Sequence, residues 1–105
     1  MKISYKQIET INEFIDAIRI RIEVFIIEQK CPPVYDPDEL DKISHHYIAI
    51  ADKTIVAMVR LREDPKGVAK IENMVLKKEY RGKGIGVSLT KYVIKEAKKD
   101  RKSVV

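Results

Sequence analysis

Apolar residues recur at two different periods along this chain, and each change of period marks a change of secondary structure. Four short segments are rich in β-branched residues and are predicted strands: 3–8, 46–51, 54–62 and 68–76. Two longer segments, 11–28 and 84–99, carry apolar residues every three or four positions, which predicts amphipathic helices. The predicted order is therefore strand, helix, three strands, helix.

Local signals mark the ends of these elements. Thr10 followed by Glu13 forms a capping box at the start of the first helix, and Cys31-Pro32-Pro33 ends that helix. The tetrapeptide Asp64-Pro65-Lys66-Gly67 predicts a tight turn between the last two strands of the run. Three consecutive strands with short connections predict an antiparallel meander.

Each predicted helix has one apolar face. In the first helix this face comprises Ile11, Phe14, Ile15, Ile18, Ile22, Phe25 and Ile26, whereas Arg19, Arg21 and Glu23 fall outside it. In the second it comprises Ile85, Leu89, Tyr92, Val93 and Ala97. We therefore predict one α/β (α+β) domain over residues 1–105, with a mixed, mainly antiparallel sheet and helices on both faces.

Composition narrows the class of protein. A chain of 105 residues that is 45% hydrophobic and 35% charged has room for one soluble domain. Its net charge of +5 favours an anionic partner, such as a phosphorylated cofactor, nucleic acid or a membrane surface, but also fits a basic protein without one. Sixteen acidic residues are mixed with the basic ones, and no apolar run is long enough to span a bilayer. We expect neither a nucleic acid nor a membrane partner.

Cys31 is the only cysteine. An internal disulfide and a cysteine-rich zinc site are therefore excluded, and we expect a reducing, cytoplasmic setting with no bound metal. A packed thiol is a better interpretation of Cys31 than a nucleophile, because no basic residue is close to it in sequence.

The segment between the last predicted strand and the second helix carries the clearest chemistry. Gly82, Gly84 and Gly86 lack side chains, so that backbone N–H groups there can converge on an anion. The helix adds its unpaired N–H groups and the positive end of its dipole, and Lys77, Lys78, Arg81 and Lys83 add positive charge. The spacing matches neither a Walker loop nor a dinucleotide-binding turn. The remaining interpretations are a pyrophosphate cradle of another kind and a basic glycine-rich turn without a ligand.

This segment resembles a known family. Arg81-Gly-Lys-Gly-Ile-Gly86 matches the Arg/Gln-x-x-Gly-x-Gly/Ala signature of the GNAT superfamily of N-acetyltransferases. The preceding Leu76–Tyr80 is similar to the apolar-x-Pro-Glu-Tyr lead-in of that family, with Lys78 at the proline position. Residues 21–32, with Asp38, Asp41 and His46, resemble a bacterial subgroup of predicted acyltransferases within it.

The resemblance implies a function and a site. It implies that acetyl-coenzyme A is the co-substrate and that its acetyl group passes directly to a primary amine of a small molecule or peptide. The backbone of Met74, Val75 and Leu76 would pair with the pantetheine arm. The pyrophosphate would lie on the N–H groups of Arg81, Gly82, Lys83, Gly84, Ile85 and Gly86.

The reaction needs a base for the amine proton and an acid for the leaving thiolate. Glu72 is the candidate base, because strand alternation predicts that it shares a face with Met74 and Leu76. An equally weighted interpretation makes Glu72 a cross-strand partner of a lysine or arginine. Glu28 is a weaker candidate, and His45 and His46 are better interpreted as structural residues.

The chain departs from the family pattern at its end. Lys102-Ser103-Val104-Val105 resembles a strand that has only begun, so we expect the domain to stop at the start of strand five. The tyrosine that serves as acid in the family has no position here. An alternative function is therefore a coenzyme A-binding or interaction module without catalysis. An uncovered strand edge also predicts a homodimer. The acidic loop of Asp36, Asp38, Glu39 and Asp41 could attract a cationic amine, but a solvated loop is the better interpretation.

Overall fold

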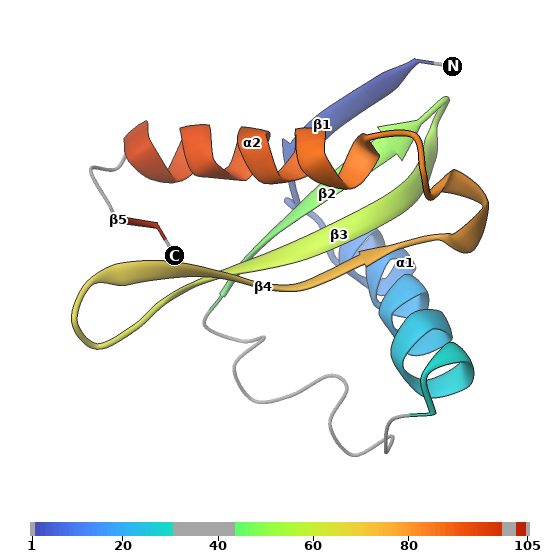
Figure 1. The fold of residues 1–105 in the computed structure, drawn as a ribbon, viewed down its shortest axis with the longest axis horizontal. Helices are drawn as coiled ribbons and strands as arrows, with labels where there is room; N and C mark the ends of the chain where they lie inside the picture. Colours follow the sequence, from blue (N-terminus) through green and yellow to red (C-terminus); the bar gives the residue numbers. More distant parts are fainter. Residues whose placement is uncertain (1, 31–43, 100–102, 105) are drawn as a thin grey trace.

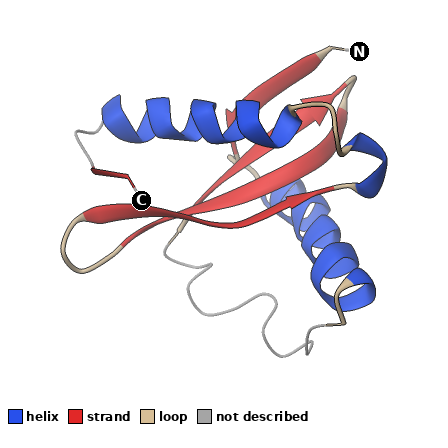
Figure 2. Cartoon of the chain, in the orientation of Figure 1, coloured by secondary structure: helices blue, strands red, loops and turns tan. Residues whose placement is uncertain are grey.

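A five-stranded sheet organises the protein, and helices lie on both of its faces (Figures 1 and 2). The computed structural model describes residues 2–30, 44–99 and 103–104. The elements, in chain order, are β1 (Ile3–Gln7), α1 (Ile11–Arg21), η1 (Ile22–Glu28), β2 (His45–Ala51), β3 (Thr54–Glu63), β4 (Val68–Leu76), η4 (Lys78–Tyr80), α2 (Ile85–Lys99) and β5 (Ser103–Val104).

The strands lie in sequence order, from β1 to β5. The first four pair antiparallel, and the predicted meander of β2, β3 and β4 is confirmed. Strand β5 pairs parallel with the beginning of β4, through Val68 with Ser103 and Ala69 with Val104. The predicted mixed, mainly antiparallel sheet is therefore confirmed, with strand ends within one residue of those expected from the pattern.

Helix α2 covers one face of the sheet, and its predicted apolar side is confirmed. Ile85, Leu89, Val93 and Ala97 are buried against a core made by Tyr47, Ala49, Val59 and Leu61 together with neighbouring residues of the sheet. Tyr92 is half-buried and stacks on Tyr5, with ring centroids 5.9 Å apart. This packing fixes the position of the N-terminus of α2 beside the end of β4.

Helix α1 packs on the opposite face, but its predicted apolar side is partly wrong. Ile11 is 70% exposed and Ile15 is 45% exposed, whereas Arg21 is buried. The helix contacts the sheet through a line that runs past Ala17 and Arg21, about a third of a turn away from Ile11 and Ile15. The small side chain of Ala17 allows this close approach, which the count of large apolar residues does not predict.

The predicted helix over 11–28 changes its winding after Arg21. Residues Ile22–Glu28 form a π-helix, in which the N–H of Gln29 bonds the carbonyl of Val24 at 2.9 Å. This segment consists largely of β-branched and aromatic residues, which favour the α-helix weakly. The wider turn brings Glu28 beside the loop that follows β4.

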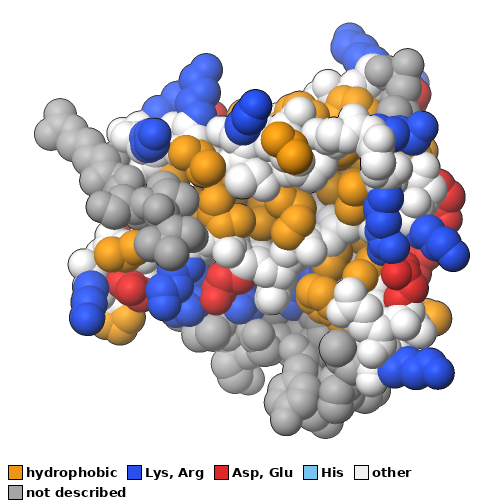
Figure 3. Space-filling view, in the orientation of Figure 1, with side chains coloured by type: hydrophobic (Ala, Val, Ile, Leu, Met, Phe, Trp, Pro, Cys, Tyr) orange, Lys and Arg blue, Asp and Glu red, His pale blue; other side chains and the backbone are white. Residues whose placement is uncertain are grey.

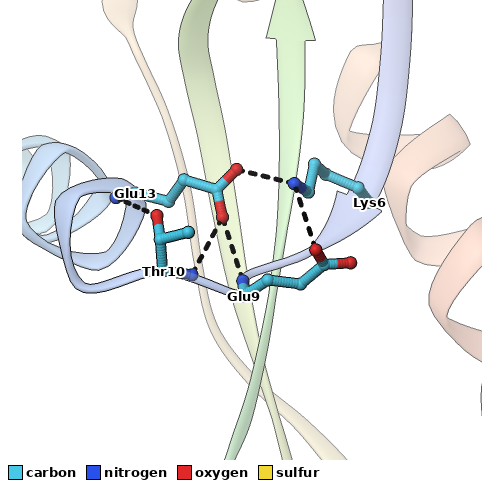
Figure 4. Close-up of polar contacts among 4 residues, drawn as sticks. All are labelled: Lys6, Glu9, Thr10 and Glu13. Atoms are coloured by element: carbon cyan, nitrogen blue, oxygen red, sulfur yellow. Dashed lines mark hydrogen bonds and ion pairs between the residues drawn. The ribbon is translucent and has the colours of Figure 1, made fainter.

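The start of α1 is fixed by a polar cluster that also joins it to β1 (Figure 4). The hydroxyl of Thr10 accepts the N–H of Glu13 at 3.1 Å, and the Glu13 carboxylate accepts the N–H groups of Glu9 and Thr10. The ammonium of Lys6 on β1 donates to the same carboxylate at 2.7 Å. The predicted capping box is confirmed.

This cluster predicts a pH-dependent stability. The hydrogen bond from Lys6, with those from the amides of Glu9 and Thr10, lowers the pKa of Glu13 from 4.5 to about 2. The stabilisation is therefore complete above pH 4.5 and is lost as the pH falls towards 2. We expect Glu13→Gln to lower the melting temperature at pH 7, and the difference from wild type to shrink between pH 4.5 and 2.

Thr10→Ala is the control for this experiment. It removes a cap that does not titrate, so its cost of about 1 kcal/mol is expected to be the same at every pH. A Glu13→Gln effect that stays constant across the acid range would contradict this account. Melting curves followed by circular dichroism between pH 7 and pH 2 measure both variants.

Strand β4 contains a β-bulge at Asn73. Met58 of β3 pairs with Val75 and Arg60 pairs with Glu72, so that β4 has one more residue than β3 in this interval. Asn73 has φ of +55°, a left-handed conformation that asparagine tolerates better than most residues. The extra residue reverses the alternation of side chains beyond the bulge. As a result, Ile71 and Met74 both pack on the α2 side of the sheet, although they are three positions apart.

The bulge predicts the outcome of two substitutions. Asn73→Val is expected to destabilise the fold by about 1–2 kcal/mol, because a β-branched residue is strained at positive φ. Glycine adopts this conformation freely, so Asn73→Gly is expected to be more stable than Asn73→Val by about 1–2 kcal/mol. Urea denaturation measures both. Equal stability of the two variants would argue against a bulge at this residue.

Candidate functional site

The loop between β4 and α2 is built to leave backbone groups accessible. After Leu76 the N–H of Lys77 bonds the carbonyl of Val56 at 2.9 Å, which fixes the point where the chain leaves the sheet. Gly82 and Gly84 then have φ of +79° and +77°, which side-chain-bearing residues rarely adopt. A Cβ atom at Gly82, Gly84 or Gly86 would find no heavy atom within 4 Å, so the space beside the loop is open.

Several amide N–H groups of this loop have no backbone partner among the described residues. The first helical bond of α2 runs from the N–H of Ser88 to the carbonyl of Gly84 at 3.1 Å, so the amides of Ile85, Gly86 and Val87 have no partner inside the helix. Among the described residues, the amides of Gly82–Gly84 make no backbone hydrogen bond. These donors, with the positive end of the helix dipole, are suited to bind a phosphate group.

The side chains around the loop have different roles. Ile85 is 3% exposed and anchors α2 in the core, so only its amide is available to a ligand. Tyr80 packs on the same core. Lys78 and Lys83 are exposed and add positive charge. The amide of Arg81 already bonds the carbonyl of Lys78, at 3.3 Å, which weakens its predicted role as a phosphate donor.

The guanidinium of Arg81 is bound to protein groups. Its two terminal nitrogens each donate to Glu28 at 2.9 Å, and its Nε donates to the carbonyl of Leu76 at 3.1 Å. This hydrogen bonding lowers the pKa of Glu28 and raises the pKa of Arg81. The contact joins η1 to the loop across 53 residues of sequence, and no signal in the sequence predicts it.

The predicted pantetheine-binding residues lie at an accessible edge. Met74 and Leu76 are half-buried on the α2 side, whereas Val75 is buried on the α1 side. Among the described strands, β4 pairs on its outer edge only at Val68 and Ala69, so the backbone from 70 to 76 has no strand beside it there. Figure 3 shows apolar side chains exposed between α2 and the sheet on this face.

Glu72 does not share the face of Met74 and Leu76, so that prediction is wrong. The bulge at Asn73 reverses the alternation, and Glu72 lies on the side of Arg60 and Arg62. Arg62 donates from Nε at 2.8 Å and from a terminal nitrogen at 3.2 Å, and Arg60 lies 3.0 Å from the same carboxylate. The hydrogen bond from Arg62, with the charge of Arg60, lowers the pKa of Glu72.

The two histidines have structural contacts. His46 is buried and meets the ring of Phe14 edge-on, with centroids 4.9 Å apart. His45 is exposed, and its Nδ1 accepts the amide of Gln7 at 2.9 Å. Cys31 and the acidic loop of Asp36, Asp38, Glu39 and Asp41 lie outside the described residues.

Two further observations concern the described part of the chain. No group of three or more His, Cys, Asp or Glu side chains is arranged there to hold a metal ion. Neither α1 nor α2, nor any other described helix, combines the length and hydrophobicity that crossing a bilayer requires.

Comparison with known proteins identifies the family. The model of the acetyltransferase (GNAT) family matches residues 12–105. The chain belongs to this family. It is 33% identical over 82 residues to the uncharacterized N-acetyltransferase YjcF of Bacillus subtilis, with 78% of this chain and 58% of that protein covered. The chain therefore spans less than two thirds of the length of that relative.

Solved structures of GNAT proteins share the fold. An acyl-CoA N-acyltransferase from Pseudomonas aeruginosa superposes with a TM-score of 0.83 and 30% identity, covering 93% of this chain and 72% of that one. A predicted acetyltransferase from Clostridium acetobutylicum, solved with acetyl-CoA, gives a TM-score of 0.70 at 17% identity, covering 99% and 79% of the two chains. The predicted resemblance to GNAT acyltransferases is thus confirmed at the level of family and fold.

The loop geometry predicts the effect of a charge at Gly84. We expect Gly84→Asp to weaken acetyl-coenzyme A binding at least tenfold, roughly the cost of placing a carboxylate against a phosphate. Gly67→Asp is the matched control, because Gly67 has φ of +81° and lies in the turn at the opposite end of β4. Calorimetric titration measures both variants, and equal affinities would show that the coenzyme lies elsewhere.

Proposed function

We propose that this GNAT protein binds acetyl-coenzyme A along β4 and the following loop and transfers the acetyl group to a primary amine. One observation carries the proposal. The uncovered edge of β4 leads directly into the loop before α2, where the amides of Gly82–Gly84 make no backbone hydrogen bond among the described residues. Coenzyme A has an extended pantetheine arm that carries amides and ends in a pyrophosphate. The arm matches the edge of β4, and the pyrophosphate matches the loop that follows it.

The binding roles follow from that arrangement. The amides of the pantetheine arm pair with the backbone of Met74, Val75 and Leu76, as an added strand would. The pyrophosphate lies on the amides of Gly82, Lys83, Gly84, Ile85 and Gly86 and at the positive end of α2, and Arg81 supports the loop. The structural neighbour solved with acetyl-CoA supports this choice of co-substrate.

The proposed reaction is direct transfer. The amine nitrogen forms a C–N bond with the thioester carbonyl carbon, the C–S bond breaks, and the coenzyme thiolate leaves and takes up a proton from solvent. The proton of the attacking amine passes to a base, which we propose is Glu72. It would act through water, because its carboxylate lies on the opposite side of the sheet from Met74 and Leu76. Its ionisation at neutral pH suits this role, although the two arginines weaken it as a base.

The role of Glu72 predicts a kinetic effect. Glu72→Gln is expected to lower kcat about 100-fold, the contribution typical of a general base, without weakening acetyl-coenzyme A binding. Arg62→Gln removes the main cause of the low pKa of Glu72, so the acid limb of the rate profile should move to higher pH. An unchanged kcat in Glu72→Gln would leave Glu72 as a structural partner of Arg60 and Arg62.

One experiment separates the two function classes. Calorimetry with acetyl-coenzyme A is followed by thiol-release assays with a panel of primary amines. Binding with amine-dependent thiol release supports the transferase, which the family comparisons favour. Binding without release for any amine would support the coenzyme-binding module. An absence of binding would overturn both.

We also propose that the protein is a cytoplasmic homodimer. The pantetheine arm would cover β4 only from Met74 to Leu76, so the outer edge from 70 to 73 has no strand partner among the described residues, and such edges pair readily with other chains. A single cysteine fits a reducing compartment. Sedimentation at micromolar concentration, with and without coenzyme A, tests the dimer, and a monomer under both conditions would refute it.

A further inference from the structure

We propose that Glu28 is a positioning residue that holds the pyrophosphate loop in its binding conformation through Arg81. The inference rests on the proposed function, since it concerns the same loop. The proposed ligand site does not include Glu28. Its effect passes through the guanidinium of Arg81 to the glycine that follows it.

The contact between Glu28 and Arg81 fixes the orientation of the Arg81 side chain. Two parallel hydrogen bonds of 2.9 Å join the guanidinium of Arg81 to the carboxylate of Glu28, and a third of 3.1 Å joins it to the carbonyl of Leu76. Two parallel bonds fix the plane of the guanidinium as well as its position. Arg81 is thereby held between η1 and the end of β4, immediately before Gly82.

The loop needs such a support because its own backbone is permissive. Gly82 and Gly84 lie at positive φ with open space around them, and a glycine-rich segment loses much conformational freedom when it is ordered. Tyr80 and Ile85 pack on the core at the two ends of the loop. Arg81 is the side chain that ties the interval between them to a separate element.

Exposure and charge argue against two simpler roles for Glu28, namely a stabilising ion pair and a direct contact with the phosphates. The side chains of Arg81 and Glu28 are 39% and 35% exposed, and exposed ion pairs contribute little to global stability. A carboxylate near a phosphate site is also electrostatically unfavourable by itself. A role in orientation explains why an acidic residue stands here, and the π-helical turn of η1 explains how it reaches the loop.

Two readouts test the proposal. Glu28→Gln removes the charge and one of the two parallel bonds, and Arg81→Lys keeps the charge but loses the planar fork. We expect each variant to weaken coenzyme A binding about fivefold or more by calorimetry, within the range of coupling between sites. In the ligand-free protein, we expect faster cleavage after Lys83 by a lysine-specific protease. Melting temperatures should change by less than about 4 °C.

Glu23→Gln is the matched control, because it removes the same charge from an exposed position of the same helical segment. It should leave both affinity and cleavage at the wild-type level. In the double variant Glu28→Arg with Arg81→Glu, the cleavage rate should return most of the way to the slow wild-type rate, because the ion pair can form again with the two charges exchanged.

The outcomes are distinct from those that test the proposed function. Tighter coenzyme binding by Glu28→Gln would show that Glu28 competes with a phosphate for Arg81, and unchanged binding and cleavage would show that the contact is incidental. Either result overturns the proposal. If the wild-type protein binds no coenzyme A, the proposed function fails, while the cleavage rates of Glu28→Gln and Glu23→Gln still decide whether Glu28 orders the loop.

Discussion

The one-sided pairing of β4 is the constraint on which the rest of this structure depends. Its inner edge is joined to β3, and its outer edge meets β5 only at Val68 and Ala69 within the described residues. Backbone N–H and C=O groups need partners. The uncovered part of β4 is therefore a place where an extended ligand can complete a sheet, and α2 places a positively polarised terminus at the end of the same strand.

The sequence predicted the architecture well because the elements carry strong local signals. Thr10 and Glu13 form the expected cap, and the apolar spacing of Ile85, Leu89 and Val93 defines the buried side of α2. The glycine loop was also predicted, and Gly82 and Gly84 have the positive φ that glycine permits. These features depend on residues close together in the chain, which a pattern can capture.

The features that the sequence missed or predicted wrongly depend on contacts between distant residues or on local changes in the helix or strand geometry. Nothing near Glu28 in sequence indicates Arg81 as its partner, and the burial of Arg21 depends on how closely α1 approaches the sheet. The face of Glu72 was predicted from regular alternation, which the bulge interrupts. An asparagine inside an otherwise strand-like segment was the available signal, because asparagine is depleted in strands and tolerates the left-handed region.

The bulge at Asn73 also affects how relatives of this protein should be aligned. In a regular strand, every second position has the same environment, so a gap of one residue exchanges core and surface for all positions beyond it. Ile71 and Met74 lie on one side of the sheet although three positions separate them. A relative that lacks the extra residue would therefore need a one-residue gap at this point. An ungapped alignment would compare its core with the opposite face of this strand and make conserved packing look like divergence.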